Sequence, residues 1–482
     1  MSDVIVIGAG FGGLGAALAL VEAGHRPLLL ESLKYPGGCA STFERGGDRF
    51  ESGATLFSGF DEGQLFHRII ERHAISVETV PIDPLVELRA GFTLTVPRSR
   101  GLFVDSLCRL PSAPVEKLRG FFATQQRVAD ALWPLFDDPA LLPPFDLKMI
   151  AAHLRRAGKY LPLLSLMGAP LGRLLDEVDF EPLRIFADAV CQITVQTPAA
   201  EAEAPLALAA LDYFFRGTRH VRGGIGELAW GMARAVERGG GSLGFAERVA
   251  AIERRGTRWH VRTRKRELDA DAIVANLLPS ALHALGLPPS RSTRALDARV
   301  LRGWGAAMQY RVVDRDVGGA SAHHLELVAD PARPFQEGNH VFCSISALDE
   351  ERTRDGLRTV TISTHVPLDP PRTRGRDDAA YFAGVQDRMN ATLSLRAPEL
   401  VAATRRTMTA SPRTFERFTG RPRGLVGGIP RVAGLWNYAS LSPREPWPGI
   451  VLAGDSVFPG QSTLATTVGG YRAAAVIADR LR

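Results

Sequence analysis

The chain begins with a pattern of glycines directly behind a short apolar run, and this pattern restricts the fold more than any other feature of the sequence. Residues 3–7 predict a buried β-strand, and Gly8, Gly10 and Gly13 follow it ahead of an apolar stretch over 14–21. Glycines let backbone approach a phosphate closely, and the helix that begins there offers free N–H groups. A second apolar run ends in Glu31, about 20 residues further on, where the ribose contact of a dinucleotide is expected. The N-terminal segment therefore predicts a dinucleotide-binding βαβ unit.

The residues after Glu31 indicate which dinucleotide is bound. A nicotinamide-binding domain would continue into further βα units, whereas this chain has the pair Gly37–Gly38 and a glycine-rich stretch over 46–53. A glycine pair behind the ribose acid lets a second loop close over the pyrophosphate. Near the other end of the chain, an apolar run over 449–453 leads directly into Gly454–Asp455. The two ends of the sequence predict two parts of one flavin dinucleotide site.

These motifs resemble those of the glutathione-reductase-like flavoproteins of the amine oxidase superfamily. The segments 36–43, 51–63 and 454–461 are similar, within that superfamily, to the family of bacterial phytoene desaturases, carotenoid isomerases and retinol saturases. The resemblance implies FAD, with Asp455 on its ribityl chain, Val249 against its adenine end and Pro459 to Ser462 beside the isoalloxazine. The stretch after Gln461 departs from the family, which more often has a second glycine there.

The resemblance also implies a reaction. It points to an FAD-dependent oxidoreductase that acts on a long lipophilic polyene or isoprenoid, in which a hydride leaves an allylic carbon for flavin N5 and a quinone or oxygen takes the electrons. Three alternatives stay open: a redox-neutral cis–trans isomerase that uses reduced FAD, an amine or lipid oxidase on the same scaffold, and a noncatalytic flavin-bound assembly factor.

Two absences bear on these alternatives. The chain has no lysine between 286 and 444, where amine oxidases of this fold commonly place one near flavin N5. It has no cysteine after Cys343, so the cysteinyl attachment of the animal monoamine oxidases is missing. FAD is therefore expected to bind noncovalently.

The candidate site residues come from these segments. Those predicted to bind FAD are Gly8, Gly10, Phe11, Gly12, Gly13, Glu31, Ser32, Gly37, Gly38, Cys39, Val249, Gly454, Asp455, Gln461 and Ser462. Those predicted to face the flavin ring and the substrate are Thr55, Phe57, Pro459 and Gly460. No catalytic side chain is assigned, since polyene desaturation needs orientation and a dry tunnel more than acid–base groups. The adjacent His323 and His324 point to opposite faces of a strand, so no metal site is expected.

The order of predicted elements indicates an α/β protein with a discontinuous FAD-binding domain. This domain is Rossmann-like, of the glutathione reductase type, and carries an inserted α+β substrate domain with a helical lid. A helix is predicted over 225–236, a hairpin at 259–262, and strands over 248–252, 272–276, 308–313 and 340–346. The predicted boundaries are 1–75, 212–285 and 445–482 for the FAD-binding domain, and 76–211 and 286–444 for the substrate domain.

Composition limits the partners and the compartment. The net charge is +6, but the sequence has no basic stripe interleaved with aromatic residues, so nucleic acid is not an expected partner. The four cysteines have no disulfide or metal spacing, and the first strand begins too early for a signal peptide, which favours the cytoplasm. No uncharged apolar run reaches the roughly 18 residues of a membrane span. The basic, interrupted apolar stretch over 141–167 suits a lid that touches the inner face of the membrane, or a lid packed on the core.

Overall fold

A five-stranded parallel sheet forms the base of the fold in the computed structural model, which describes residues 4–143, 147–319, 322–368, 378–439 and 441–482. The strand order is β19-β13-β1-β2-β9, with bounds β1 Val4–Ile7, β2 Leu28–Leu30, β9 Ser242–Gly244, β13 Ala272–Ala275 and β19 Ile450–Leu452. Four of these strands are buried along their whole length, as a parallel sheet covered on both faces requires. The predicted Rossmann-like unit is confirmed.

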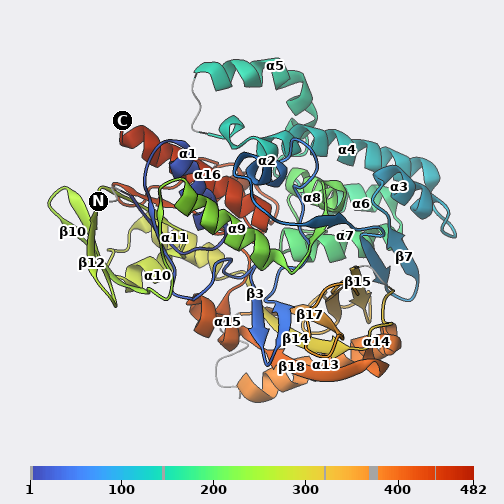
Figure 1. The fold of residues 1–482 in the computed structure, drawn as a ribbon. Helices are drawn as coiled ribbons and strands as arrows, with labels where there is room; N and C mark the ends of the chain where they lie inside the picture. The colour runs from blue at the N-terminus through green and yellow to red at the C-terminus, as the bar shows by residue number, and fades with distance from the viewer. Residues whose placement is uncertain (1–3, 144–146, 320–321, 369–377, 440) are drawn as a thin grey trace.

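Helices cover one face of this sheet and a small second sheet covers the other (Figure 1). The helices are α1 (Phe11–Glu22), α9 (Ile225–Arg238) and α16 (Thr463–Arg480). A Cβ atom at Gly470 of α16 would lie only 2.0 Å from the carbonyl oxygen of Gly12, so α1 and α16 approach each other closely because both carry glycine there. The small antiparallel sheet consists of β10 (Val249–Arg255), β11 (Arg258–Thr263) and β12 (Glu267–Ala270).

One strand of the parallel sheet was not predicted. β9 lies at the sheet edge beside β2, whereas the strand predicted over 248–252 becomes β10 and pairs with β11. β9 has three residues, one of them exposed and only one buried, so it carries no recognisable alternation. The helix predicted over 225–236 is confirmed as α9.

The second large element is a seven-stranded mixed sheet in the order β18-β14-β17-β16-β15-β6-β7. Its strands are β6 Val86–Arg89, β7 Thr93–Val96, β14 Trp304–Val313, β15 His323–Val328, β16 His340–Ile345, β17 Arg358–Pro367 and β18 Thr404–Ala410. The strands predicted over 308–313 and 340–346 lie in β14 and β16. The first substrate-domain segment, residues 76–211, contributes the β6–β7 hairpin to this sheet, and β6 pairs in parallel with β15.

A helical layer completes the first insertion. It consists of α3 (Arg100–Cys108), α4 (Val115–Asp137), α5 (Leu147–Leu164), α6 (Gly172–Val178), α7 (Glu181–Thr194) and α8 (Ala204–Leu211). Smaller elements connect the layers: β3 Thr42–Arg45, β4 Asp48–Glu51, α2 Leu65–Arg72, β5 Thr79–Pro81, β8 Arg219–Val221, α10 Pro279–Ala284, α11 Arg291–Val300, α13 Asp378–Arg396, α14 Pro398–Ala402 and α15 Pro412–Thr419.

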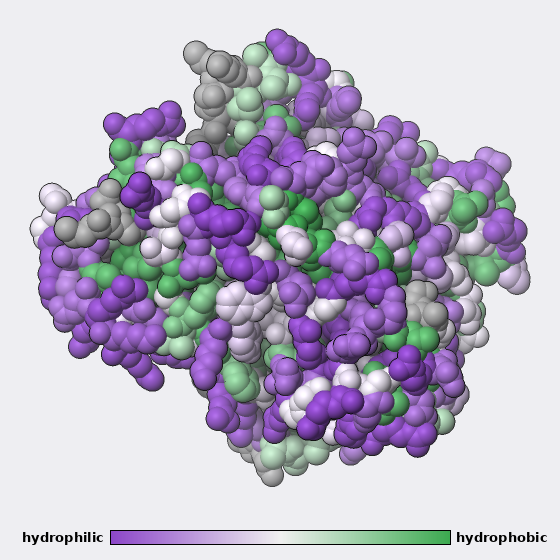
Figure 2. Space-filling view, viewed as in Figure 1, coloured by the Kyte–Doolittle hydropathy of each residue, from purple (hydrophilic) through white to green (hydrophobic). Residues whose placement is uncertain are grey.

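α5 projects from the rest of the molecule, at the top of Figures 1 and 2. It exposes large apolar side chains, of which Leu154 is 72% and Leu161 65% accessible to solvent. Residues 144–146 of the predicted lid lie outside the described residues. Within the described ranges, no helix combines the length and the apolar character needed to cross a bilayer.

Candidate functional site

A cavity of about 670 Å³ lies where the parallel strands end. Gly8, Glu31, Asn276 and Gly454 line it, and each stands within two residues of the carboxyl end of its own strand, β1, β2, β13 and β19. Ligands of open α/β sheets bind at this edge. The cavity continues from these loops to the helical layer and the seven-stranded sheet.

The predicted cofactor residues gather on this wall. Those that line the cavity are Gly8, Gly10, Phe11, Gly12, Glu31, Ser32, Gly37, Gly38, Cys39, Val249, Gly454, Asp455, Gln461 and Ser462. Of the residues predicted to face the flavin ring and the substrate, Thr55 and Pro459 also line it.

Three predicted residues lie elsewhere. A Cβ atom at Gly13 would be 1.9 Å from the carbonyl oxygen of Gly8, so Gly13 packs α1 against β1 and does not reach the cavity. Phe57 is buried in the core on the helical side of the parallel sheet, and its carbonyl accepts a hydrogen bond from the Arg219 amide. Gly460 lies just behind the cavity wall, where it makes room for the side chain of Arg431.

The first glycine loop leaves no space for side chains. Gly8 has φ +94°, which favours glycine, and a Cβ atom at Gly12 would lie 2.7 Å from Asn276 Oδ1 and 2.9 Å from the Gly454 amide nitrogen. α1 begins behind Gly10 without a side-chain cap. The first N–H groups of the helix therefore remain free for an anionic ligand such as a pyrophosphate.

Glu31 binds the glycine loop itself. Its Oε2 atom accepts a hydrogen bond from the Ala9 amide at 2.8 Å, and its Oε1 atom accepts bonds from the Leu33 amide and the Ser32 hydroxyl. These bonds fix the carboxylate at the end of β2, at the cavity wall, where the sequence predicts a ribose contact.

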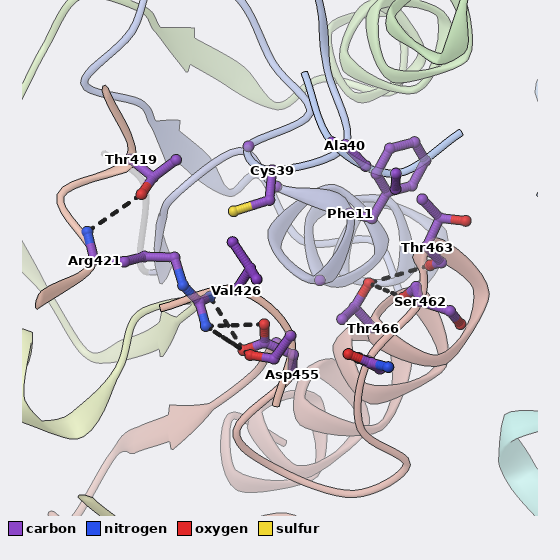
Figure 3. Close-up of a pocket in the computed structure, with 18 of the residues that line it drawn as sticks. Phe11, Cys39, Ala40, Thr419, Arg421, Val426, Asp455, Ser462, Thr463 and Thr466 are labelled. Atoms are coloured by element: carbon purple, nitrogen blue, oxygen red, sulfur yellow. Dashed lines mark hydrogen bonds and ion pairs between the residues drawn. The ribbon is translucent and has the colours of Figure 1, made fainter. Parts of the chain in front are cut away.

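Asp455 is paired with a partly buried arginine, Arg421. The guanidinium of Arg421 donates to Asp455 Oδ1 at 3.1 and 3.2 Å and to the carbonyls of Leu425 and Gly427 at 2.7 and 2.9 Å. Figure 3 shows the two side chains pointing toward one another beside Cys39. Burial raises the pKa of the Cys39 thiol, so that the thiol is protonated at neutral pH.

The loop before α16 joins the cofactor side of the cavity to the helical layer. Gln461 donates from Nε2 to the carbonyls of Ile193 and Thr194 at the end of α7. Ser462 caps α16 by accepting the Ala465 amide at 3.0 Å. The start of α16, from Ser462 to Thr466, thus lines the same cavity as the glycine loop (Figure 3).

The far part of the cavity is mainly apolar. Its wall consists of Trp133, Phe136, Ile193, Leu206, Ala209, Ala210, Tyr213, Ala306, Met308 and Phe342, with Gln196, Ser363, Thr364 and His365 as polar members. Burial lowers the pKa of His365 to about 3, so its imidazole is neutral. None of the described residues on the wall is a lysine.

Among the wall residues that sequence reasoning missed are Asn276, Arg421 and Arg431. Asn276 follows β13 directly and donates to the Gly8 carbonyl at 3.3 Å; a polar residue behind a buried strand was the signal for it. Arg421 and Arg431 stand in irregular segments among many other arginines, and no local pattern distinguishes them.

The site fits a flavin dinucleotide. One cavity is lined by a glycine loop that a Cβ atom would fill, an uncapped helix start, a fixed acid at the ribose position and a partly buried acid near the C-terminus. A comparison with protein-family models matches residues 11–310 to the flavin containing amine oxidoreductases. The chain belongs to this family.

Sequence relatives match nearly the whole chain. Prolycopene isomerase from Arabidopsis thaliana is 25% identical over 98% of this chain and 82% of its own length. Hydroxyneurosporene desaturase from Cereibacter sphaeroides is 27% identical over 99% of this chain and 97% of its own length. Among solved structures, cyclohexylamine oxidase from Brevibacterium oxydans superposes with a TM-score of 0.63 at 19% identity, covering 100% of this chain and 99% of that one. The structural likeness concerns the fold, and the sequence relatives place the chain among carotenoid desaturase-like and isomerase-like members of the family.

Proposed function

We propose that the protein is an FAD-dependent oxidoreductase that acts on a long lipophilic polyene or isoprenoid. The observation that carries this proposal is the continuity of the cavity, which runs from the glycine loops into an apolar chamber between α4, α7, α8 and the seven-stranded sheet. Such a chamber buries a hydrocarbon chain and holds it against the cofactor side. The sequence relatives named for carotenoid substrates support the same class.

The side chains of the chamber orient the substrate and exclude water. FAD, when bound, supplies the hydride acceptor for oxidation of an allylic carbon. Trp133, Phe342 and Leu206 offer apolar surface from three different elements, so that a rigid chain is fixed along its length. Because His365 is neutral, it adds no positive charge to this surface.

An amine substrate fits the cavity poorly. The wall contains no lysine among its described residues, and it contains the buried guanidinium of Arg431. An ammonium group beside this cation would be repelled in a medium of low dielectric constant. The amine oxidase alternative is therefore disfavoured on electrostatic grounds.

A redox-neutral cis–trans isomerase that uses reduced FAD is the second candidate. It is favoured by the near full-length match to the prolycopene isomerase. The same chamber serves both reactions, since each needs a long polyene held beside the flavin.

We propose that FAD binds noncovalently through the wall residues described above. Of the four cysteines only Cys39 lines the cavity, and its thiol is a poor nucleophile because desolvation raises its pKa. A quinone or oxygen is the proposed electron acceptor. We further propose the domain boundaries predicted from the sequence, with the FAD-binding domain in the segments 1–75, 212–285 and 445–482.

The projecting helix α5 supports a peripheral membrane contact in the cytoplasm. Ile150, Leu154, Leu161 and Leu164 are exposed on it, and Arg155, Arg156 and Lys159 lie among them in the sequence. Exposed apolar side chains beside basic ones suit the surface of an anionic bilayer.

The test is anaerobic addition of phytoene in liposomes to the purified flavin-loaded protein. Bleaching of oxidised flavin together with a red-shifted polyene product supports desaturation. An unchanged flavin, with conversion of a poly-cis carotenoid only after chemical reduction of FAD, supports the isomerase. A flavin that neither substrate perturbs, with no product in either assay, contradicts both and favours the noncatalytic alternative.

A further inference from the structure

Arg431 places a buried positive charge on the cavity wall. Its side chain lines the cavity although the residue is only 8% exposed. Nη2 donates to the carbonyl of Pro459 at 3.0 Å, whereas Nε and Nη1 have no hydrogen-bond partner within the described part of the chain. Burial lowers its pKa to about 10, so the guanidinium is charged at neutral pH.

The nearest acid does not neutralise Arg431 by direct contact. Glu203 acts on Arg431 through its charge, but its oxygens accept the amides of Gly168 and Leu206 and the hydroxyl of Tyr438. No ion pair links Arg431 to a carboxylate of the described residues. The donors Nε and Nη1 therefore remain available to a ligand.

The backbone holds Arg431 at a defined place. Its amide donates to the Val195 carbonyl at the end of α7, and its carbonyl accepts the Glu203 amide ahead of α8. A Cβ atom at Gly460 would be 2.9 Å from Nη2, so the glycine makes room for the guanidinium. Arg431 thus lies between the loop predicted beside the isoalloxazine and the apolar wall of α7 and α8.

The other arginines on the wall have different surroundings. Arg421 is bonded to Asp455, and Arg248 stands next to Val249 at the predicted adenine end. Among the described arginines of the wall, only Arg431 lies between the 459–462 loop and the helices α7 and α8 without an acidic partner in contact.

We propose that Arg431 binds a carboxylate of the substrate, so that the substrate class is a polyene or isoprenoid acid. This inference rests on the proposed function and narrows its substrate. A carboxylate can accept two N–H groups of a guanidinium side by side, whereas a hydrocarbon would leave them unpaired in an apolar cavity.

The charge of Arg431 gives a second reason. Hydride loss from an allylic carbon leaves positive charge on the polyene, and a bare guanidinium on the wall opposes it. A bound carboxylate cancels the charge of the guanidinium. An acid substrate therefore removes an electrostatic penalty that a hydrocarbon would retain.

The experiment compares all-trans-retinoic acid with methyl retinoate, which has the same polyene and no charge. Binding to the flavin-loaded protein is followed by the perturbation of the flavin absorption band near its long-wavelength maximum. We expect the acid to bind about 10-fold or more tightly than the ester to the wild-type protein, from one charge-assisted pair. Arg431→Met should equalise the two, and Arg431→Lys should keep part of the preference.

Arg472→Met is the matched control. Arg472 is 3% exposed and donates to the Phe458 carbonyl next to the same loop, but it is not among the described residues of the cavity wall. Its loss should leave the preference for the acid unchanged. If Arg431→Met does not fold, the comparison of acid and ester on the wild-type protein still tests the assignment, because equal binding of the two refutes it.

Equal binding of acid and ester by the wild-type protein, or a preference that survives in Arg431→Met, overturns the assignment. So does an Arg431→Met variant that changes the flavin reduction potential while the acid preference stays intact, since Arg431 would then serve the cofactor. Turnover of phytoene without any acid preference refutes this inference alone. An acid preference that is lost in Arg431→Met, in a protein that converts no polyene, refutes the proposed function and the substrate class and leaves Arg431 only as a carboxylate-binding residue.

Discussion

The pair Arg421–Asp455 gives the sharpest test of the cofactor side of the site. Asp455 is the proposed ligand of the ribityl chain, and Arg421 holds its carboxylate at 3.0 Å. We consider the variants Arg421→Met and Asp455→Asn, and the double variant that contains both. Each single change leaves one charged partner of the pair without its counter-charge.

The burial of the pair in the structure determines how much stability each variant should lose. The side chains of Arg421 and Asp455 are only 18% and 14% exposed, so the pair is largely removed from solvent. Breaking a buried pair typically costs about 3–5 kcal/mol of stability, and the residual exposure places Arg421→Met near the lower end, about 3 kcal/mol. Asp455→Asn should cost about 2 kcal/mol, because Arg421 keeps its bonds to two carbonyls. The double variant should cost about 2 kcal/mol less than the sum of the two.

The assay is urea denaturation of the flavin-free protein, followed by tryptophan fluorescence, with FAD titration as the second readout. The control is the exposed pair Arg405–Asp314, whose side chains are 58% and 35% accessible and whose removal should cost less than about 1 kcal/mol. FAD affinity should fall about 10-fold or more in Asp455→Asn through the loss of a charged hydrogen-bond acceptor. If the stability losses of the two single variants sum to that of the double variant within about 0.5 kcal/mol, the coupling between Arg421 and Asp455 is refuted. Unchanged FAD affinity in Asp455→Asn would refute the role of Asp455 as a ligand.

Three further outcomes are expected. Gly12→Ala should lose FAD, because a Cβ atom at Gly12 would lie 2.7–2.9 Å from Asn276 and Gly454. Gly158→Ala on α5, where a Cβ atom meets nothing within 4 Å, should retain FAD. Equal FAD retention by the two variants in a flavin absorbance assay would contradict the role of the first glycine loop in binding the cofactor. Burial alone would raise the pKa of Glu350, but the hydrogen bond from His220 and nearby positive charge lower it below the ordinary value. Its stabilisation is therefore present above the ordinary carboxyl pKa and lost as the pH falls below it, so Glu350→Gln should flatten the acid limb of stability against pH in urea titrations; an unchanged limb would exclude this role. Leu154→Glu should reduce cosedimentation with anionic vesicles without lowering the melting temperature, and undiminished binding would rule out α5 as the contact.

The cofactor half of the fold could be predicted because its signals are local. A strand that runs into glycines, and an acid at the end of the next strand, are short patterns with one structural solution. The same holds for Gly454–Asp455 behind β19. These residues line one cavity because parallel strands end at the same edge of a sheet.

The substrate side of the site could not be predicted in this way, because it depends on contacts between segments that are distant in the sequence. Phe57 stands two residues after Thr55 behind the glycine-rich stretch, yet Phe57 enters the core and Thr55 lines the cavity. Nothing in the local sequence decides between these two directions. Arg431 is likewise one of many arginines, and only its burial against α7 and Gly460 makes it distinctive.

The order of the sheet explains why the site needs both ends of the chain. β13 lies between β19 and β1 in the sheet, so the loop that follows β19 passes over the end of β13 to meet the first glycine loop. Asn276 stands at the end of β13, where its side chain touches the positions of both Gly12 and Gly454. The two insertions depart from this sheet and return to it, which brings the apolar chamber to the same edge. The cofactor loops and the chamber therefore lie at one edge of the sheet. The substrate carboxylate that we propose for Arg431 would be held close to the loop that carries Asp455, because Arg431 donates to the Pro459 carbonyl in that loop.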